Sequence, residues 1–182
     1  MAIIVEPDAL AITDCLDAFQ KADRFASVKD AIDELTSNTN AAVYLDAGNS
    51  HILPVWDIAS RLTSAGVSRA RGFALNVSTT YETAEQVKFG EAVSAKIGGK
   101  RYVVDTSRNG LGPAPDGPLS WCNPAGRALG VRPTVATSGK HADAYLWVKP
   151  PGESDGSCGR DEPAPGTWWN DYAVGLVERS SY

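Results

Sequence analysis

Histidine and cysteine are scarce in this sequence, and long apolar runs and basic clusters are missing. Two histidines and three cysteines in 182 residues, with no C-x-x-C pair, leave little material for a zinc site. No apolar run approaches the ~20 residues of a membrane-spanning helix. With 17 Lys and Arg against 22 Asp and Glu, the net charge of −5 argues against nucleic-acid binding. We expect no metal, no membrane and no nucleic acid as partners.

Phosphate-binding loops, nucleophile elbows and dinucleotide fingerprints are also missing, so we expect no cofactor. What the chain does contain is an alternation of short apolar strands with helical segments. Strands are expected at Ala2–Glu6, Ala42–Leu45, Phe73–Leu75, Arg101–Val104 and Ala144–Val148. Helices are expected at Ala9–Phe19, Val28–Leu35, 58–65, Thr83–Ile97 and Trp169–Arg179, the third of them ending at Gly66. This pattern predicts a single α/β domain over residues 1–182, with parallel strands covered by helices.

Polar residues gather where the expected strands end. They are Glu6, Asp8, Asp46, Asn76, Asp105 and Lys149. Because the carboxyl ends of parallel strands face the ligand site in such folds, these side chains are expected on one rim. A long stretch dense in Gly and Pro, Thr106–Lys140, is of a length that is usually functional in a compact domain. Together these features indicate an enzyme.

Each candidate residue also has a structural explanation. Asp8 is suited to cap the helix expected at Ala9–Phe19, and Asp46 to a turn. Arg108, beside acidic strand ends, is expected to be a buried ion-pair partner rather than an anion binder. Taken alone, the segment Lys149–Gly156 is better explained as a solvated loop than as part of a site. Trp121 fits either the core or a sugar-stacking surface.

Six sequence blocks, in their order and spacing, carry a resemblance to a known family. They are Ile4–Leu10, Tyr44–Gly48, Val104–Gly110, Trp121–Pro124, Gly126–Gly130 and Asp143–Gly156. With these blocks the chain resembles the C-terminal portion of glycoside hydrolase family 6, the cellulose-degrading β-1,4-glucanases, and looks closest to its actinobacterial branch. The resemblance covers essentially the whole chain. It implies a partial, distorted seven-stranded (β/α) barrel in which five parallel strands are present and the N-terminal strands are missing.

The resemblance also implies hydrolysis of β-1,4-glucosidic bonds with inversion and an extracellular location. Asp8 matches the general acid and Asp155 the carboxylate proposed as base, as inversion requires an acid and an activated water on opposite faces of the ring. Asp46 matches a third acidic residue and Arg108 a cation near the acid. The positions that match sugar-binding residues are Trp121, Lys149, Glu153, Asn49 and Thr79. The family also implies a Cys122–Cys158 disulfide, with Cys15 left as a free thiol.

Several positions depart from the family pattern. Asn49 and Ile52 stand where the family has His and Trp, and Thr79 stands where it has Asn. Asp8 lies close to the start of the chain, and the apolar run after Met1 lacks the features of a signal peptide. We therefore expect an exposed first strand that favours self-association, and weak hydrolysis by this chain alone. The alternative to a glucanase is a non-catalytic, glucan-binding remnant or gene fragment of one.

Overall fold

Five parallel strands form one sheet whose order follows the chain. The computed structural model describes residues 1–38 and 40–182. The strands are β1 (Ala2–Val5), β2 (Ala42–Asp46), β3 (Gly72–Leu75), β4 (Arg101–Asp105) and β5 (Ala142–Leu146). Each strand pairs in parallel with the next one in sequence. This confirms the parallel α/β architecture predicted from the alternation of strands and helices.

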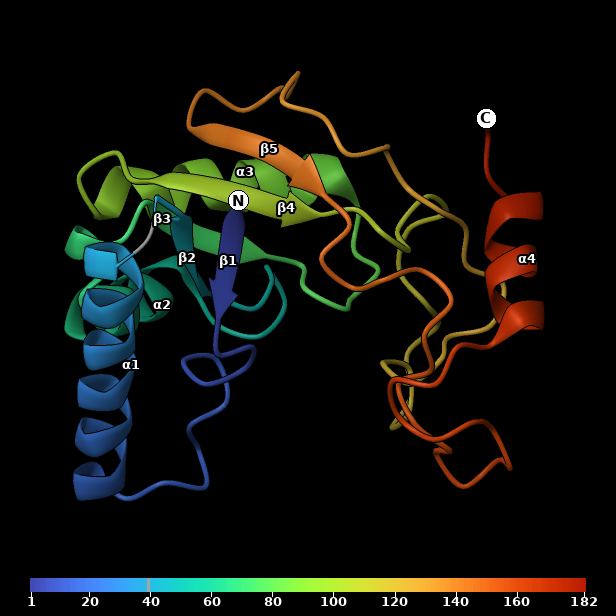
Figure 1. Ribbon diagram of the computed structural model, residues 1–182, viewed down its shortest axis with the longest axis horizontal. Helices are drawn as coiled ribbons and strands as arrows, with labels where there is room; N and C mark the ends of the chain where they lie inside the picture. The colour runs from blue at the N-terminus through green and yellow to red at the C-terminus, as the bar shows by residue number, and fades with distance from the viewer. Residues whose placement is uncertain (39) are drawn as a thin grey trace.

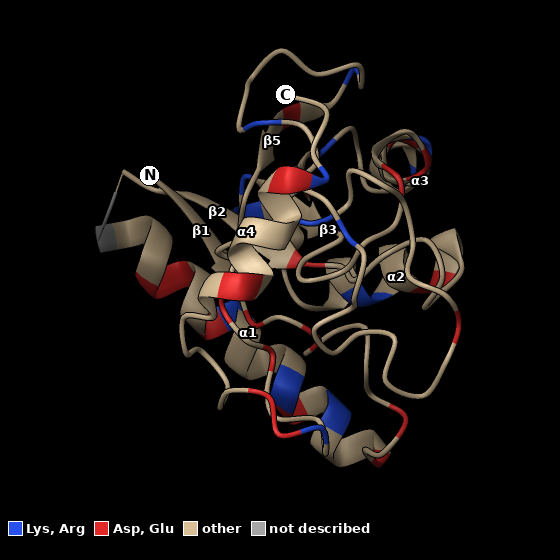
Figure 2. Ribbon diagram, turned by 90° about the vertical axis from the view of Figure 1, so that its right-hand side faces the viewer, with Lys and Arg blue, Asp and Glu red and all other residues tan. Residues whose placement is uncertain are grey.

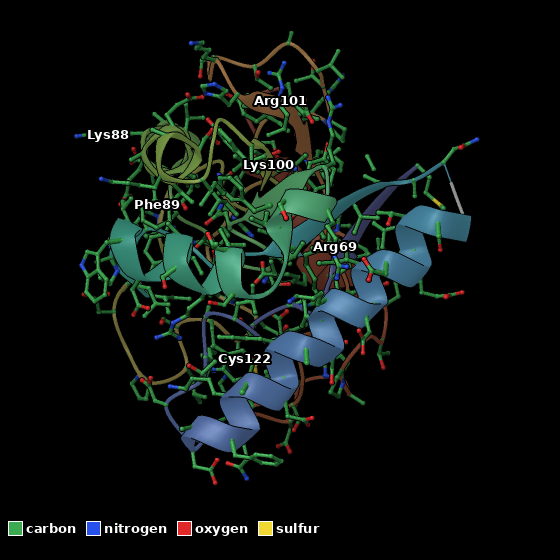
Figure 3. All side chains as sticks on the ribbon, turned by 90° about the vertical axis from the view of Figure 1, so that its left-hand side faces the viewer. Arg69, Lys88, Phe89, Lys100, Arg101 and Cys122 are labelled. Atoms are coloured by element: carbon green, nitrogen blue, oxygen red, sulfur yellow. A yellow bond between two sulfur atoms is a disulfide. The ribbon has the colours of Figure 1, made fainter. Side chains whose placement is uncertain are left out.

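Three helices cover one face of the sheet, and a fourth lies apart from them. The covering helices are α1 (Ala18–Asn38), α2 (Val55–Ser64) and α3 (Thr83–Lys96), with a 3-10 turn at Val67–Arg69 (Figures 1 and 3). The largest apolar core lies under these helices, where outward-facing strand residues such as Leu45, Phe73 and Val104 are fully buried. Helix α4 (Asn170–Glu178) stands beyond the carboxyl ends of β4 and β5 (Figures 1 and 2). The first part of the segment after β4 and the segment between β5 and α4 gather at that end of the sheet, whereas the residues just before β5 run back to its amino-terminal end (Figure 1).

The sheet is curled into part of a barrel. On its concave face, the Tyr44 hydroxyl of β2 donates a hydrogen bond of 2.7 Å to Asp143 of β5, although two strands separate them in the sheet order. Arg71 adds two hydrogen bonds to the same carboxylate. Such a contact between non-neighbouring strands requires strong curvature. The predicted partial barrel is thereby confirmed, and Asp143 ties together the amino-terminal ends of its strands.

The prediction of a helix at Ala9–Phe19 is wrong, because residues 9–17 hold two turns, at 9–11 and 14–15, and no helix, and α1 begins only at Ala18. The cause is a capping box. Gln20 donates its backbone N–H to the Asp17 carboxylate, and Asp17 donates its own to the Gln20 side chain. The apolar Leu10 is buried within the turns instead of on a helix face. The helix expected at Val28–Leu35 is thus the later part of one longer helix.

The remaining elements differ from expectation by one to three residues at their ends. Strand β5 begins at Ala142 rather than Ala144, and α2 extends back to Val55. Helix α2 is followed, as predicted, by Gly66 with a φ of +84°, a conformation that suits glycine at a helix C-terminus. In the described part of the chain, no helix has both the length and the apolar character needed to cross a membrane.

Candidate active site

A cavity of about 640 Å³ opens at the carboxyl ends of the strands. The predicted site residues that line it are Asp8, Asn49, Thr79, Trp121, Lys149 and Asp155. They come from the segments that follow β1, β2, β3, β4 and β5, so the polar strand ends do share one rim. Asp46 and Arg108 are buried and hold lining residues from the interior. Among the residues predicted for catalysis or sugar binding, Glu153 is the one that neither lines the cavity nor contacts its acids in the described structure.

Asp8 lies in a turn directly after β1 and is exposed to solvent. Its φ of +69° places it in the left-handed region, which is unusual for a residue with a side chain. Its backbone N–H donates a 3.0 Å hydrogen bond to Asp46 Oδ2. This contact supports the strained conformation and fixes where the Asp8 side chain enters the cavity. Since no helix begins at Ala9, the helix-cap interpretation of Asp8 is wrong.

Asp46 ends strand β2 and is almost completely buried, with 2% of its surface exposed. Its Oδ2 accepts the N–H groups of Asp8 and Gly48, whereas Oδ1 has no hydrogen-bond partner among the described residues. Burial raises the pKa of Asp46 to about 7, and the negative charges of Asp8 and Asp105 act in the same direction. Below that pH, Asp46 is a neutral acid beside Asp8.

Asp155 is held by two cations and a backbone amide. Arg108 Nη1 lies 2.6 Å from Asp155 Oδ2, and Lys149 Nζ lies 3.3 Å from Oδ1. The Arg108 side chain is fully buried; burial acts to lower its pKa, but Tyr172 and Asp155 outweigh this and raise it. Arg108 is therefore a permanent cation in an ion pair, as its position beside acidic strand ends suggested.

Asn123 is a site residue that the sequence did not single out. The side-chain oxygen of Asn123 accepts the backbone N–H of Asp155 at 2.7 Å, and the backbone N–H of Asn123 donates to Asp155 Oδ2 at 2.8 Å. This reciprocal pair locks the loop after β4 onto the loop that carries Asp155. The block Trp121–Pro124 is part of the family resemblance, but its residue types do not indicate that Asn123 pairs with Asp155, 32 residues away.

The predicted sugar-binding residues have distinct surroundings. Trp121 is 56% exposed, which makes its ring accessible, whereas Asn49 is buried and its side-chain oxygen accepts the His51 N–H. Thr79 donates its hydroxyl to Asn76 at 2.6 Å. Glu153 is half-buried, and its backbone pairs with Trp168.

A disulfide joins Cys122 to Cys158, and Cys15 is free and exposed, as the resemblance implied. The bond links the loop after β4 to the segment that follows Asp155; Cys122 is labelled in Figure 3. In the described structure, a carboxylate oxygen of Glu162 lies within 4.8 Å of both sulfur atoms. Because the disulfide engages both thiols, this group does not provide a metal site.

The family model for glycosyl hydrolases family 6 matches residues 1–180. The chain belongs to this family. It is 44% identical over 181 residues to endoglucanase A of Cellulomonas fimi, a match that covers 99% of this chain and 38% of that protein. Endoglucanase A of Thermobispora bispora is 40% identical over 180 residues, with 96% of this chain and 38% of the relative covered.

A solved structure of the same family resembles the whole fold. The endoglucanase Cel6 from Mycobacterium tuberculosis, in complex with methyl-cellobiosyl-4-deoxy-4-thio-β-D-cellobioside, superimposes with a TM-score of 0.95 at 58% identity. The match covers 98% of this chain and 61% of that chain. The family 6 chain described here therefore spans 38% of the curated relatives above and 61% of this structural neighbour.

Proposed function

We propose that this family 6 chain hydrolyses β-1,4-glucosidic bonds of cellulose or a related β-glucan with inversion at the anomeric carbon. The observation that carries the proposal is that one cavity brings Asp8 and Asp155 together with Trp121 and Lys149. It contains an acid and a carboxylate for the chemistry, together with an exposed aromatic ring and a cation for sugar contacts. The relatives named endoglucanases support the same substrate class.

In this reaction Asp8 donates its proton to the glycosidic oxygen as the bond to the anomeric carbon breaks. A water attacks that carbon from the opposite face, and its proton passes to Asp155. The accepting atom is Asp155 Oδ1, because Oδ2 already accepts Arg108 and Asn123, while the one partner of Oδ1 among the described residues is Lys149, at the longer distance of 3.3 Å.

Asp46 and Arg108 act as positioning residues in this mechanism. Asp46 holds the backbone of Asp8, and as a neutral acid it adds no second negative charge beside the proton donor. Arg108 fixes the orientation of the Asp155 carboxylate through the 2.6 Å ion pair.

Sugar binding is assigned to Trp121, Lys149, Asn49 and Thr79, all of which line the cavity. A glucose unit that contacts Glu153 would lie beyond this cavity. The disulfide supports an extracellular location, since such bonds persist in oxidising environments.

The test is the release of reducing sugar from soluble carboxymethylcellulose by the purified chain and by Asp8→Asn. Because Asp8 is exposed in the turn that follows β1, an edge strand of the described sheet, we expect weak hydrolysis. Loss of the general acid should lower it by a further ~10²–10⁴-fold. Equal activity of the two proteins would contradict the assignment. Calorimetric binding of cello-oligosaccharide without any hydrolysis would favour the non-catalytic, glucan-binding alternative.

A further inference from the structure

Asp105, at the end of β4, collects hydrogen bonds from three different loops. It is 1% exposed and does not line the cavity. Its Oδ1 accepts the N–H of Ser107 at 2.8 Å. Its Oδ2 accepts the N–H groups of Ser78 at 3.0 Å and of Lys149 at 3.1 Å. One buried carboxylate thus joins the segments that follow β3, β4 and β5.

These contacts belong to a closed ring. The Ser78 carbonyl accepts a hydrogen bond from Arg108 Nη2, and Arg108 Nη1 lies 2.6 Å from Asp155 Oδ2. Asp155 Oδ1 contacts Lys149 Nζ at 3.3 Å, and the Lys149 backbone N–H returns to Asp105. The ring therefore runs Asp105, Ser78, Arg108, Asp155, Lys149 and back to Asp105, with a hydrogen bond or ion pair at each step.

Ser78 shows that the ring constrains the backbone. Its φ of +58° lies in the left-handed region, which costs free energy for a residue with a side chain. Both sides of this residue are held, because its N–H donates to Asp105 and its carbonyl accepts from Arg108. Such a conformation persists only where the surrounding contacts over-determine it.

We propose that Asp105 is a positioning residue, which closes this ring and thereby sets where Asp155 and Lys149 stand in the cavity without itself touching the substrate. The ring is a feature of the fold, whereas its effect on turnover rests on the function proposed above.

The role requires a carboxylate rather than an amide. The three hydrogen bonds described above come from backbone N–H groups and fall on both oxygens of Asp105, so both oxygens must accept. In Asp105→Asn the side-chain NH₂ faces either the buried amide of Ser107 or the half-buried amides of Ser78 and Lys149, and each orientation leaves at least one of these amides without its acceptor. Loss of a partner for a buried donor is costly, although the two side chains have nearly the same shape.

The first measurement is hydrogen exchange of individual amides by NMR. In Asp105→Asn we expect the Ser78 and Lys149 amides to exchange about tenfold faster or more, while amides inside β2 keep their protection. Asp155→Asn breaks the ring on its far side and should speed exchange at Ser78, which Asp155 does not touch. If Asp105→Asn does not fold, the exchange rate of the Ser78 amide in Asp155→Asn tests whether the ring restrains Ser78. Unchanged exchange at Ser78 in the variants that fold overturns the ring.

The second measurement separates positioning from general destabilisation. Asp143→Asn is the matched control, because Asp143 is a structural acid bound to Tyr44 and Arg71 at the opposite end of the sheet. With carboxymethylcellulose, we expect kcat of Asp105→Asn to fall about tenfold or more below that of Asp143→Asn, compared where both are fully folded. Equal kcat values overturn the positioning role. If the unmodified chain releases no sugar, the proposed function fails, and the exchange data still decide whether Asp105 closes the ring.

Discussion

Asp46→Asn should change how the stability of the chain depends on pH. Asp46 Oδ2 accepts two backbone N–H groups, and Oδ1 has no partner among the described residues. The asparagine side chain can therefore place its oxygen where Oδ2 lies and its NH₂ where Oδ1 lies. The substitution removes the titration of a buried carboxyl group and keeps its shape and its hydrogen bonds.

The direction of this pH dependence follows from the raised pKa of Asp46. Between the usual pKa of 3.8 and the folded value of about 7, the unfolded chain has lost this proton and the folded chain retains it. Stability therefore falls as pH rises through this range. The change in pKa corresponds to about 4 kcal/mol of unfolding free energy, which the asparagine variant does not lose.

The assay is urea unfolding followed by tryptophan fluorescence, at pH 4 and pH 8 and equal ionic strength, with the disulfide intact. The difference in unfolding free energy between variant and unmodified chain should shift by about 4 kcal/mol in favour of Asp46→Asn on going from pH 4 to pH 8. A difference that stays constant across this range would refute the reasoning, because the folded chain would then ionise Asp46 as easily as the unfolded one.

Asp143→Asn provides a control of opposite sign. Burial acts to raise the pKa of Asp143, but hydrogen bonds from Arg71 and Tyr44 outweigh it and lower the pKa. The stability that Asp143 contributes is present above its usual pKa and is lost as pH falls through the lowered one. Asp143→Asn should therefore be destabilising at pH 7, and its penalty should shrink towards pH 3.

Three further outcomes are expected. Replacing Cys122 and Cys158 by serine should lower the unfolding free energy by about 4 kcal/mol in the chain-entropy model for a separation of 36 residues; equal urea midpoints would contradict this. Trp121→Ala should weaken cello-oligosaccharide binding by roughly 1–3 kcal/mol, by analogy with aromatic stacking on bases. It should do so without lowering the melting temperature, because the ring is exposed. Strand β1 has one strand partner among the described residues, so sedimentation should show concentration-dependent association that Ile3→Lys reduces; a strictly monomeric chain would argue against it.

The alternation of strands and helices could be predicted because its causes are local. A short apolar run such as Ala42–Leu45 predicts a buried strand from its residue types alone. Gly66 marks the end of a helix because glycine adopts a positive φ without steric cost. The start of α1 also has a local signal, because Asp17 and Gln20 form a capping box three residues apart. The Ala- and Leu-rich composition of residues 9–19 favours an earlier helix start, but the capping box is the more specific signal and places the start at Ala18.

The sequence by itself determined the family, the parallel sheet and the candidates for the site, because these depend on residue types and on their order along the chain. Only the tertiary structure decided how those candidates work together. The pairing of Asn123 with Asp155 and the three amides on Asp105 join residues far apart in sequence. Every residue except proline has the same backbone N–H group, so the residue types in the sequence do not show which of these groups will donate to Asp105 or Asp155. The raised pKa of Asp46 likewise follows from the burial that folding imposes, and not from the aspartate itself.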